Sequence, residues 1–229
     1  MTEHEEKSNK EHEEGYEERK EPIWKGPLKY IIGLFLIMLL VVWIIPGYLV
    51  KIDPAPSNIP SISEVVPEGI SLDGEKYNLS TRDKFLEFVD PSDPIIKQTT
   101  TKIVSLSCAS GEKVCHAKAL YYFVRDNLDY VSDPVNFEYV EDPKEVLLSG
   151  GGDCESGTLL LASLMESVGI NAEIVFIPGH AFLRIELNDA NNRYKWEDEW
   201  IYLDWTCSDC EFGKVPLQNL KNMEFLDVY

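Results

Sequence analysis

An uncharged apolar run near the N-terminus is the strongest pattern in the sequence. Residues 30–50 read YIIGLFLIMLLVVWIIPGYLV, without a single charge. About 20 consecutive apolar residues cross the hydrocarbon core of a bilayer as a helix. A cleaved signal peptide has a shorter apolar core, of roughly 7 to 15 residues, and ends at small residues. We therefore expect an uncleaved transmembrane helix over residues 28–50, with the lipid bilayer as a partner.

The segments on either side of this helix are polar. Nine glutamates lie in the first 22 residues, which predicts a disordered acidic tail over residues 1–27. Four prolines between Pro54 and Pro67 favour an extended spacer over residues 51–70. The basic residues closest to the helix mostly precede it, and they predict a cytoplasmic N-terminus with residues 51–229 outside the cell membrane. These basic residues are Arg19, Lys20, Lys25 and Lys29 before the helix and Lys51 after it.

The remaining residues, 71–229, have the length of one domain. Its first half has helical signals: Thr81 as an N-cap, Pro94 as the start of a second helix, and a third helix after Gly111. A fourth helix is predicted from near Cys154 to Gly169. The inward positions of the last two helices recur at the 3.6-residue period: Ala117, Leu120, Tyr121, Val124 and Leu128, then Leu160, Leu161, Leu164 and Val168.

The second half of the domain changes to strand periodicity. AEIVFI and HAFLRIEL flank Pro178 and Gly179, which predicts two antiparallel strands joined by a turn. WIYLD predicts a third strand. Alternation along HAFLRIEL places His180 on the less apolar face of its strand. The expected fold class is therefore α+β.

The charge balance argues against nucleic acid as a partner. The net charge is −19, and beyond residue 50 there are 31 acidic and 15 basic side chains. Such a surface repels polyanions.

The candidate chemistry centres on GGGDC, residues 150–154, at the start of the fourth predicted helix. The glycines allow a tight turn, and Asp153 can cap the helix. The first turn would then hold the Cys154 thiol, where the helix dipole favours a thiolate and free N–H groups can stabilise an oxyanion, although the charge of Asp153 opposes the thiolate. Taken alone, a cysteine beside an apolar helix is more often a small buried residue than a nucleophile.

A nucleophilic thiol needs a base and a group that orients the base. His180 is the nearby histidine candidate, because His4 and His12 lie in the tail and His116 lies within the third predicted helix. Asp204, at the end of WIYLD, can orient the imidazole.

The order of these residues resembles the transglutaminase-like superfamily of papain-like cysteine enzymes, especially its prokaryotic, membrane-attached members. The resemblance is carried by GGGDCESGTLLLASLMESVGINAEIVFIPGHAFLRIEL followed by IYLDWT, with YFVRDNLDYVSDP upstream, and covers about residues 112–207. It implies a catalytic triad of Cys154, His180 and Asp204. It also implies a helical lobe that carries the cysteine helix, packed against a small antiparallel sheet.

Two departures from the family pattern qualify what the resemblance implies. Animal crosslinking enzymes have Trp directly after the nucleophile, whereas Glu155 stands here, so protein crosslinking is not implied. After the Asp the family often has Pro-Thr, and here Trp205 and Thr206 follow. We expect hydrolysis of peptide or protein amides, with amine transfer and a non-catalytic membrane-anchored binding module as the open alternatives. No cofactor or metal is expected, and the substrate and oligomeric state stay open.

Four further cysteines remain: Cys108, Cys115, Cys207 and Cys210. An oxidising exterior lets such residues persist as disulfides. Nearest-neighbour pairing joins Cys108 to Cys115 and Cys207 to Cys210 and leaves Cys154 free, although four cysteines allow three connectivities. A four-thiolate zinc site and a redox role for CSDC are the alternatives.

Overall fold

The computed structural model describes residues 26–67, 69, 82–109, 111–133 and 139–228. The chain separates into two compact units, residues 1–48 and 49–229. Residues 1–25 of the predicted acidic tail, the Thr81 cap and the predicted domain start at residue 71 lie outside the described ranges.

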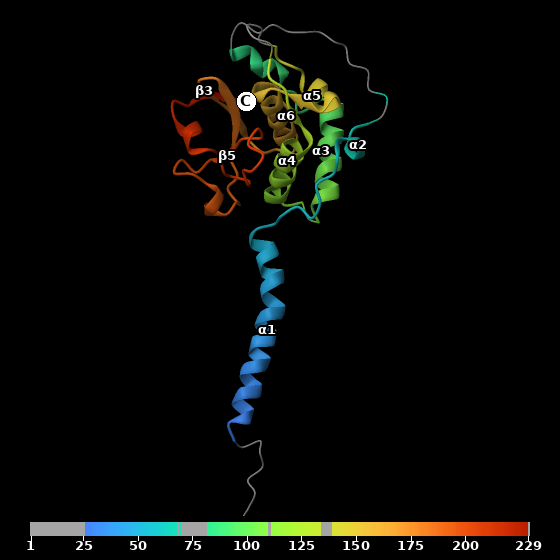
Figure 1. The fold of residues 1–229 in the computed structure, drawn as a ribbon. Coiled ribbons are helices and arrows are strands. Elements are labelled where there is room, and N and C mark those ends of the chain that lie inside the picture. The colour runs from blue at the N-terminus through green and yellow to red at the C-terminus, as the bar shows by residue number, and fades with distance from the viewer. Residues whose placement is uncertain (1–25, 68, 70–81, 110, 134–138, 229) are drawn as a thin grey trace, which may run out of the picture. The chain divides into compact units, whose positions relative to one another are not determined.

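One long helix, α1, Leu28–Ile52, makes up nearly all of the described part of the first unit and ends four residues beyond it (Figure 1). Its stretch Leu28–Ile45 has a mean hydropathy of 2.7, and none of these residues is buried. Twenty-five residues at 1.5 Å per residue give about 37 Å, more than the roughly 30 Å of a hydrocarbon core. The helix predicted over residues 28–50 is therefore present, and it is long and apolar enough to cross a membrane.

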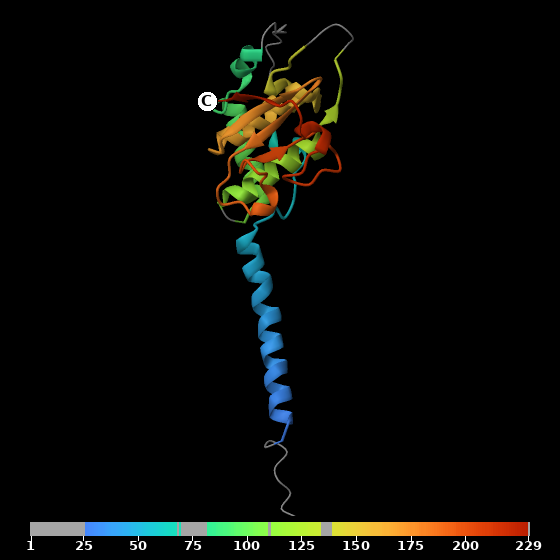
Figure 2. The ribbon, with the colours of Figure 1, turned by 90° about the vertical axis from the view of Figure 1, so that its left-hand side faces the viewer.

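The second unit packs helices against one side of a sheet (Figures 1 and 2). Its α-helices are α2 (Ile62–Val65), α3 (Pro94–Ser107), α4 (Lys113–Asn127), α5 (Pro143–Ser149) and α6 (Cys154–Ser167), and its 3₁₀ helices are η2 (Arg82–Phe88), η3 (Asn192–Tyr194) and η4 (Leu217–Leu220). Helix α6 is the centre of the unit, because it contacts α3, α4 and α5 as well as strands β3 and β4. Every residue from Ser156 to Met165 is buried, as the apolar composition of this segment predicts.

The sheet has four antiparallel strands in the order β5-β4-β3-β6. Its strands are β3 (Ala172–Ile177), β4 (His180–Ile185), β5 (Ile201–Leu203) and β6 (Glu224–Asp227). Two shorter strands, β1 (Asp129–Tyr130) and β2 (Gly151–Gly152), form a separate parallel pair. The turn at Pro178 and Gly179 pairs Ile177 with His180. The three predicted strands and the α+β class are confirmed, and β6 is an addition that the sequence did not predict.

The two faces of the sheet carry separate apolar cores. Ala181, Leu183 and Ile185 face the main core with α6. The opposite face was predicted to be the less apolar one, yet Phe182 is fully buried there in a second cluster with Tyr202. The prediction gave no reason to expect this burial, which arises because segments on both sides of β5 fold over this face. They contribute Trp196, Trp200, Val215, Leu220 and Met223.

Residues 53–66, predicted as a spacer, are attached to the second unit. The carboxylate of Asp53 accepts hydrogen bonds from Lys118, Arg193 and Tyr194. Farther along, the Ser57 amide donates to the Ser107 carbonyl at 2.8 Å, and Val65 is completely buried. We call residues 53–66 the strap, because they bind along the unit instead of projecting freely from it.

Two disulfides are present, Cys108–Cys115 and Cys207–Cys210, and Cys154 is free. The predicted pairing is confirmed. The four cysteines other than Cys154 are all disulfide-bonded, so no thiolates remain for the alternative four-thiolate zinc site. Within the described ranges, no group of three or more potential metal ligands is assembled.

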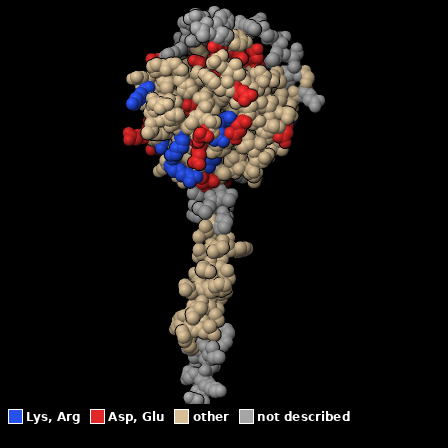
Figure 3. Space-filling model, in the orientation of Figure 1, with Lys and Arg blue, Asp and Glu red and all other residues tan. Residues whose placement is uncertain are grey.

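Charged side chains are unevenly distributed over the second unit. On the face drawn in Figure 3, Asp and Glu are scattered, while Lys and Arg gather mainly in one smaller patch. This is the distribution expected of an acidic chain.

Candidate active site

The loop before α6 places Cys154 at the start of the most buried helix in the domain. Gly150 ends α5 with φ +72°, a left-handed conformation that glycine adopts without steric cost. Gly151 and Gly152 pair with β1, and the Asp153 side chain then accepts the Ser156 amide at 2.8 Å, as an N-cap does. Cys154 is therefore held at the first helical position, as predicted, with 6% of its surface exposed.

The resting environment of the Cys154 thiol favours the protonated form. Burial raises its pKa first, and the Sγ–H group donates to Glu155 Oε2 at 2.8 Å, which raises the pKa further. The backbone N–H of Ala181 acts in the opposite direction. The helix dipole was expected to favour a thiolate, whereas the burial of the thiol and the charges of Glu155 and Asp153 favour the protonated form.

Two more carboxyls, the buried Asp153 and the half-buried Glu141, lie close to the loop that precedes α6. Burial raises the pKa of Asp153 to about 6. Burial and the charges of Asp153 and Glu145 raise the pKa of Glu141 to about 7. The Glu141 backbone N–H donates to Ser156 Oγ at 3.1 Å, so this acidic residue is attached directly to the first turn of α6.

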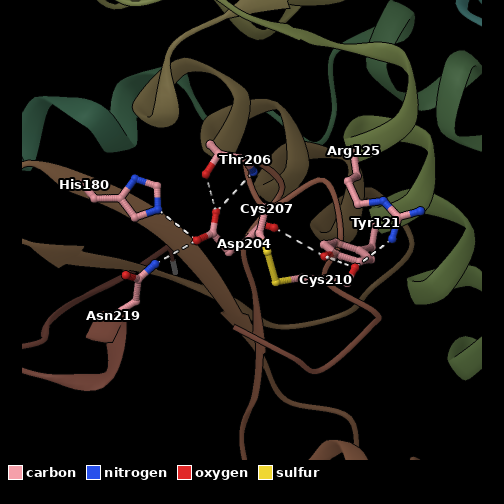
Figure 4. Close-up of a disulfide and its surroundings, with 8 residues drawn as sticks. All are labelled: Tyr121, Arg125, His180, Asp204, Thr206, Cys207, Cys210 and Asn219. Carbon is pink, nitrogen blue, oxygen red and sulfur yellow. Dashed lines mark hydrogen bonds and ion pairs between the residues drawn. A yellow bond between two sulfur atoms is a disulfide. The ribbon is translucent and has the colours of Figure 1, made fainter. Parts of the chain in front are cut away.

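His180 and Asp204 are hydrogen-bonded to each other. His180 opens β4, Asp204 follows β5, and the antiparallel pairing of these strands brings Nε2 within 2.9 Å of Asp204 Oδ2 (Figure 4). The His180 side chain is 20% exposed, whereas that of Asp204 is 2% exposed. This contact occupies Nε2, so Nδ1 is the ring nitrogen left for another partner.

The thiol and the imidazole are connected through the first residues of β4. The Cys154 sulfur faces the backbone N–H of Ala181, the residue directly after His180. The Thr158 hydroxyl, one turn into α6, donates to the Ala181 carbonyl at 3.4 Å. All three predicted residues therefore belong to one neighbourhood, where the start of α6 meets the start of β4.

Asp204 is kept ionised by its hydrogen-bond donors. Burial alone raises the pKa of its carboxyl, but the bond and charge of His180 and two bonds from Thr206 outweigh burial and hold the pKa below its ordinary value. Thr206 donates from its amide at 3.1 Å and from its hydroxyl at 2.8 Å to Oδ1. A fourth donor, Asn219 Nδ2, binds Oδ2 at 2.9 Å.

Trp205 connects the end of β5 to the start of α6. Its indole N–H donates to the Cys154 carbonyl at 3.3 Å, and its ring lies directly over Gly157. A Cβ atom at position 157 would approach the ring carbons to 2.3 Å. The Trp that replaces the family's frequent Pro therefore fits only because α6 has glycine at this position.

Sequence reasoning missed the parts played here by Glu155, Trp205 and Asn219. Thr206 had a local signal, because a hydroxyl two residues after an Asp often bonds back to its carboxylate. Asn219 had none, since its contact with Asp204 depends on where the C-terminal segment returns.

Comparisons with known proteins find one family model and several solved structures that are similar to this chain. Residues 100–209 match the family model described as "Transglutaminase-like superfamily". Among solved structures, the chain is similar to a candidate protease from Parabacteroides distasonis, with 16% identity and a TM-score of 0.40 over 53% of this chain and 24% of that one. A candidate cysteine protease from Cytophaga hutchinsonii has 16% identity and a TM-score of 0.38 over 72% of this chain and 50% of the other.

Legionella pneumophila LapG shares 16% identity, with a TM-score of 0.39 over 64% of this chain and 80% of LapG. This chain thus spans about a quarter and a half of the first two structures. No curated protein sequence matches it.

Proposed function

Because residues 100–209 belong to the transglutaminase-like superfamily, we propose that the chain is a membrane-anchored cysteine enzyme that hydrolyses amide bonds of peptides or proteins. Cys154 is the nucleophile, His180 the general base and acid, and Asp204 the residue that orients His180. The observation that carries the proposal is the hydrogen bond between His180 and the buried Asp204, formed beside the helix start that holds the free thiol.

The proposed reaction begins with a change of partner at the thiol. The Cys154 Sγ–H turns from Glu155 and transfers its proton to His180 Nδ1, while Asp204 stabilises the resulting imidazolium. The sulfur attacks the substrate carbonyl, and backbone N–H groups at the start of α6 stabilise the oxyanion. His180 then protonates the departing amine, which leaves a thioester on Cys154.

Water resolves the thioester in the second half of the reaction. His180 removes a proton from the water, the hydroxide attacks the thioester carbonyl, and the proton returns to sulfur as the carboxylic acid leaves. Amine transfer differs only in the acceptor. Hydrolysis is our first choice, and Glu155, at the position where the animal crosslinking enzymes have Trp, gives no support for protein crosslinking.

The membrane anchor of the proposal is α1. The excess of Lys and Arg before this helix supports a cytoplasmic N-terminus, with the second unit outside. Two disulfides in the second unit support the same placement, because such bonds persist in oxidising compartments.

A binding module is the second candidate function. The raised pKa of the buried Cys154 thiol favours it, since a protein that only holds a peptide needs no reactive thiolate. In that case the same site would bind a peptide or an envelope component without turnover.

The first test is mass-mapped alkylation of the non-reduced full chain in detergent, followed across pH. We expect Cys154 to be the labelled cysteine and to react more slowly in His180→Ala, while His116→Ala, which removes a histidine from α4, matches the wild type. Peptide-library cleavage that disappears in Cys154→Ala would complete the case. Equal Cys154 rates in wild type and His180→Ala, with no cleavage, would leave the binding module as the function.

A further inference from the structure

A residue outside the matched family segment contacts the Asp204 carboxylate. Asn219 lies in the 3₁₀ helix η4, Leu217–Leu220, ten residues beyond the end of the matched range 100–209. Its side-chain amide donates to Asp204 Oδ2 at 2.9 Å, and the residue is only 9% exposed. Figure 4 shows Asn219 and His180 approaching the same carboxylate oxygen.

The donors divide the two carboxylate oxygens between them. Thr206 occupies Oδ1 with its amide and hydroxyl, whereas Oδ2 accepts from both His180 Nε2 and Asn219 Nδ2. The Thr206 contacts come from the same turn as Asp204 and move with it. Asn219 therefore supplies the donor from a distant segment that restrains the position of the oxygen facing His180.

The segment that carries Asn219 is anchored on the sheet. The backbone N–H of Asn219 donates to the Pro216 carbonyl at 2.8 Å and closes the 3₁₀ turn. On either side of Asn219, Val215 and Leu220 pack into the second apolar cluster, the one that contains Phe182 and Tyr202. The Phe182 ring stacks on the His180 ring at a centroid distance of 5.8 Å. The Asn219 amide is thus presented from a packed element that also supports the histidine.

We propose that Asn219 is a positioning residue for His180, acting through Asp204. By fixing Oδ2 it holds the imidazole with Nε2 toward the carboxylate and Nδ1 toward the thiol, and as a neutral donor it favours the ionised carboxylate. The C-terminal segment is then a working part of the active site. This inference rests on the proposed roles of His180 and Asp204.

The test compares Asn219→Ala and Asn219→Asp with Gln218→Ala in the full chain. Gln218 is an exposed residue of the same 3₁₀ helix, so its variant controls for changes in η4. We expect Asn219→Ala to lower the Cys154 alkylation rate near neutral pH about 10-fold and to lower kcat by a similar factor with KM unchanged.

Asn219→Asp keeps the shape of the side chain but replaces the donor with a second carboxyl. The two carboxyls then share a proton, so the Asp204 pKa rises and the acid limb of the rate profile moves to higher pH. This variant also covers the case in which Asn219→Ala fails to fold.

The possible results separate this inference from the proposed function. Asn219 variants that follow Gln218→Ala in rate and pH profile, while His180→Ala still slows Cys154, overturn the positioning role alone. A loss of thermal stability in Asn219→Ala together with wild-type kinetics in Asn219→Asp also overturns it, because the residue is then only structural. An unchanged Cys154 rate in His180→Ala defeats the proposed function itself.

Discussion

Glu155 occupies the position that most directly controls the resting thiol. Its carboxylate accepts the Cys154 Sγ–H at 2.8 Å and, after burial, is the next cause of the raised thiol pKa. Glu155→Gln removes the negative charge and so lowers that pKa. We expect a several-fold faster alkylation of Cys154 at pH 7 to 8, measured by mass-mapped labelling. Glu197→Gln, at an exposed carboxylate before β5, should leave the rate unchanged; equal rates in both variants would show that Glu155 does not control the thiol.

Gly157 is the second position where one side chain decides the local structure. A Cβ there would lie 2.3 Å from the Trp205 ring, and this ring is fixed by its hydrogen bond to the Cys154 carbonyl. Gly157→Ala should therefore destabilise the fold by about 1–3 kcal/mol and displace Trp205. Urea denaturation followed by tryptophan fluorescence measures both effects.

The control for this prediction is Gly111→Ala, where a Cβ meets nothing within 4 Å. A urea midpoint for Gly157→Ala that is no lower than that of Gly111→Ala would mean that Trp205 can move away from α6 without loss of unfolding free energy.

The sequence could point to the chemistry of the site but not to its supporting contacts. The sequence indicated three candidate residues, Cys154, His180 and Asp204, because each lies in a recognisable local pattern and the three occur in family order. Their catalytic roles stay predictions. Asn219 could not be identified from the sequence, since neither its spacing nor its neighbours indicate that η4 contacts Asp204. The raised pKa of the thiol also escaped prediction, because it depends on the depth of burial and on the rotamer of Glu155.

At the scale of elements, prediction succeeded where the periodic pattern was long. Helix α6 and strands β3 and β4 begin at or next to the predicted residues, because apolar positions repeat through them at periods of 3.6 and 2. Helix α5 has seven residues and β6 has four, too few for either period to stand out. The burial of Phe182 was missed for another reason: residues 196–223 cover that face, and only the tertiary fold brings them there.

The Cys207–Cys210 disulfide fixes the element that follows Asp204. Within this loop the Cys210 carbonyl accepts from Arg125 at 2.7 Å and from the Tyr121 hydroxyl at 3.0 Å (Figure 4). Replacing both cysteines with serine removes the crosslink beside Asp204. We expect a few-fold loss of kcat with a modest loss of stability, about 2 kcal/mol for so short a loop.

The matched control is the Cys108→Ser/Cys115→Ser variant, which opens the other disulfide, between α3 and α4. Its melting temperature should fall while kcat is retained. Equal kcat losses in the two double variants would indicate a general loosening of the domain instead of an effect on Asp204.

For the whole molecule, buried carboxyls make stability depend on pH in two opposite ways. Asp153 and Glu141 have folded pKa values raised to about 6 and about 7, so the folded state binds more protons than the unfolded state between about pH 4 and pH 7. Stability therefore decreases as pH rises through that window. Asp204 has a lowered folded pKa, so its contribution is present above its unfolded value of 3.8 and is lost as pH falls through the folded pKa.

A stability maximum between about pH 4 and pH 5 follows from these signs, and urea midpoints across pH measure it. Glu141→Gln should flatten the decline toward neutral pH and leave the acid side unchanged. A decline as steep as that of the wild type would assign the proton uptake to other groups.

The strap, residues 53–66, is bound to the rest of the second unit through the carboxylate of Asp53. Lys118 is buried, with 4% of its side chain exposed, and its charge is balanced by Asp53 at 2.5 Å. Asp53→Ala leaves that ammonium buried without its carboxylate partner, beside the Pro54 carbonyl and the Tyr194 ring, which should cost about 3–5 kcal/mol of unfolding free energy. Arg193→Gln, which removes an exposed partner of the same carboxylate, should cost at most about 1 kcal/mol.

The decisive comparison adds Lys118→Met to Asp53→Ala. If the cost arises from an unpaired buried charge, removing the charge should restore much of the stability in urea denaturation, and hydrogen exchange in residues 53–66 should return toward the wild-type rate. If the double variant stays as unstable as Asp53→Ala, the lost energy lies in the hydrogen bond that the Tyr194 hydroxyl donates to Asp53, observed at 2.8 Å. In either case, the 53–66 segment contributes to the stability of the domain, a role that its prolines alone did not predict.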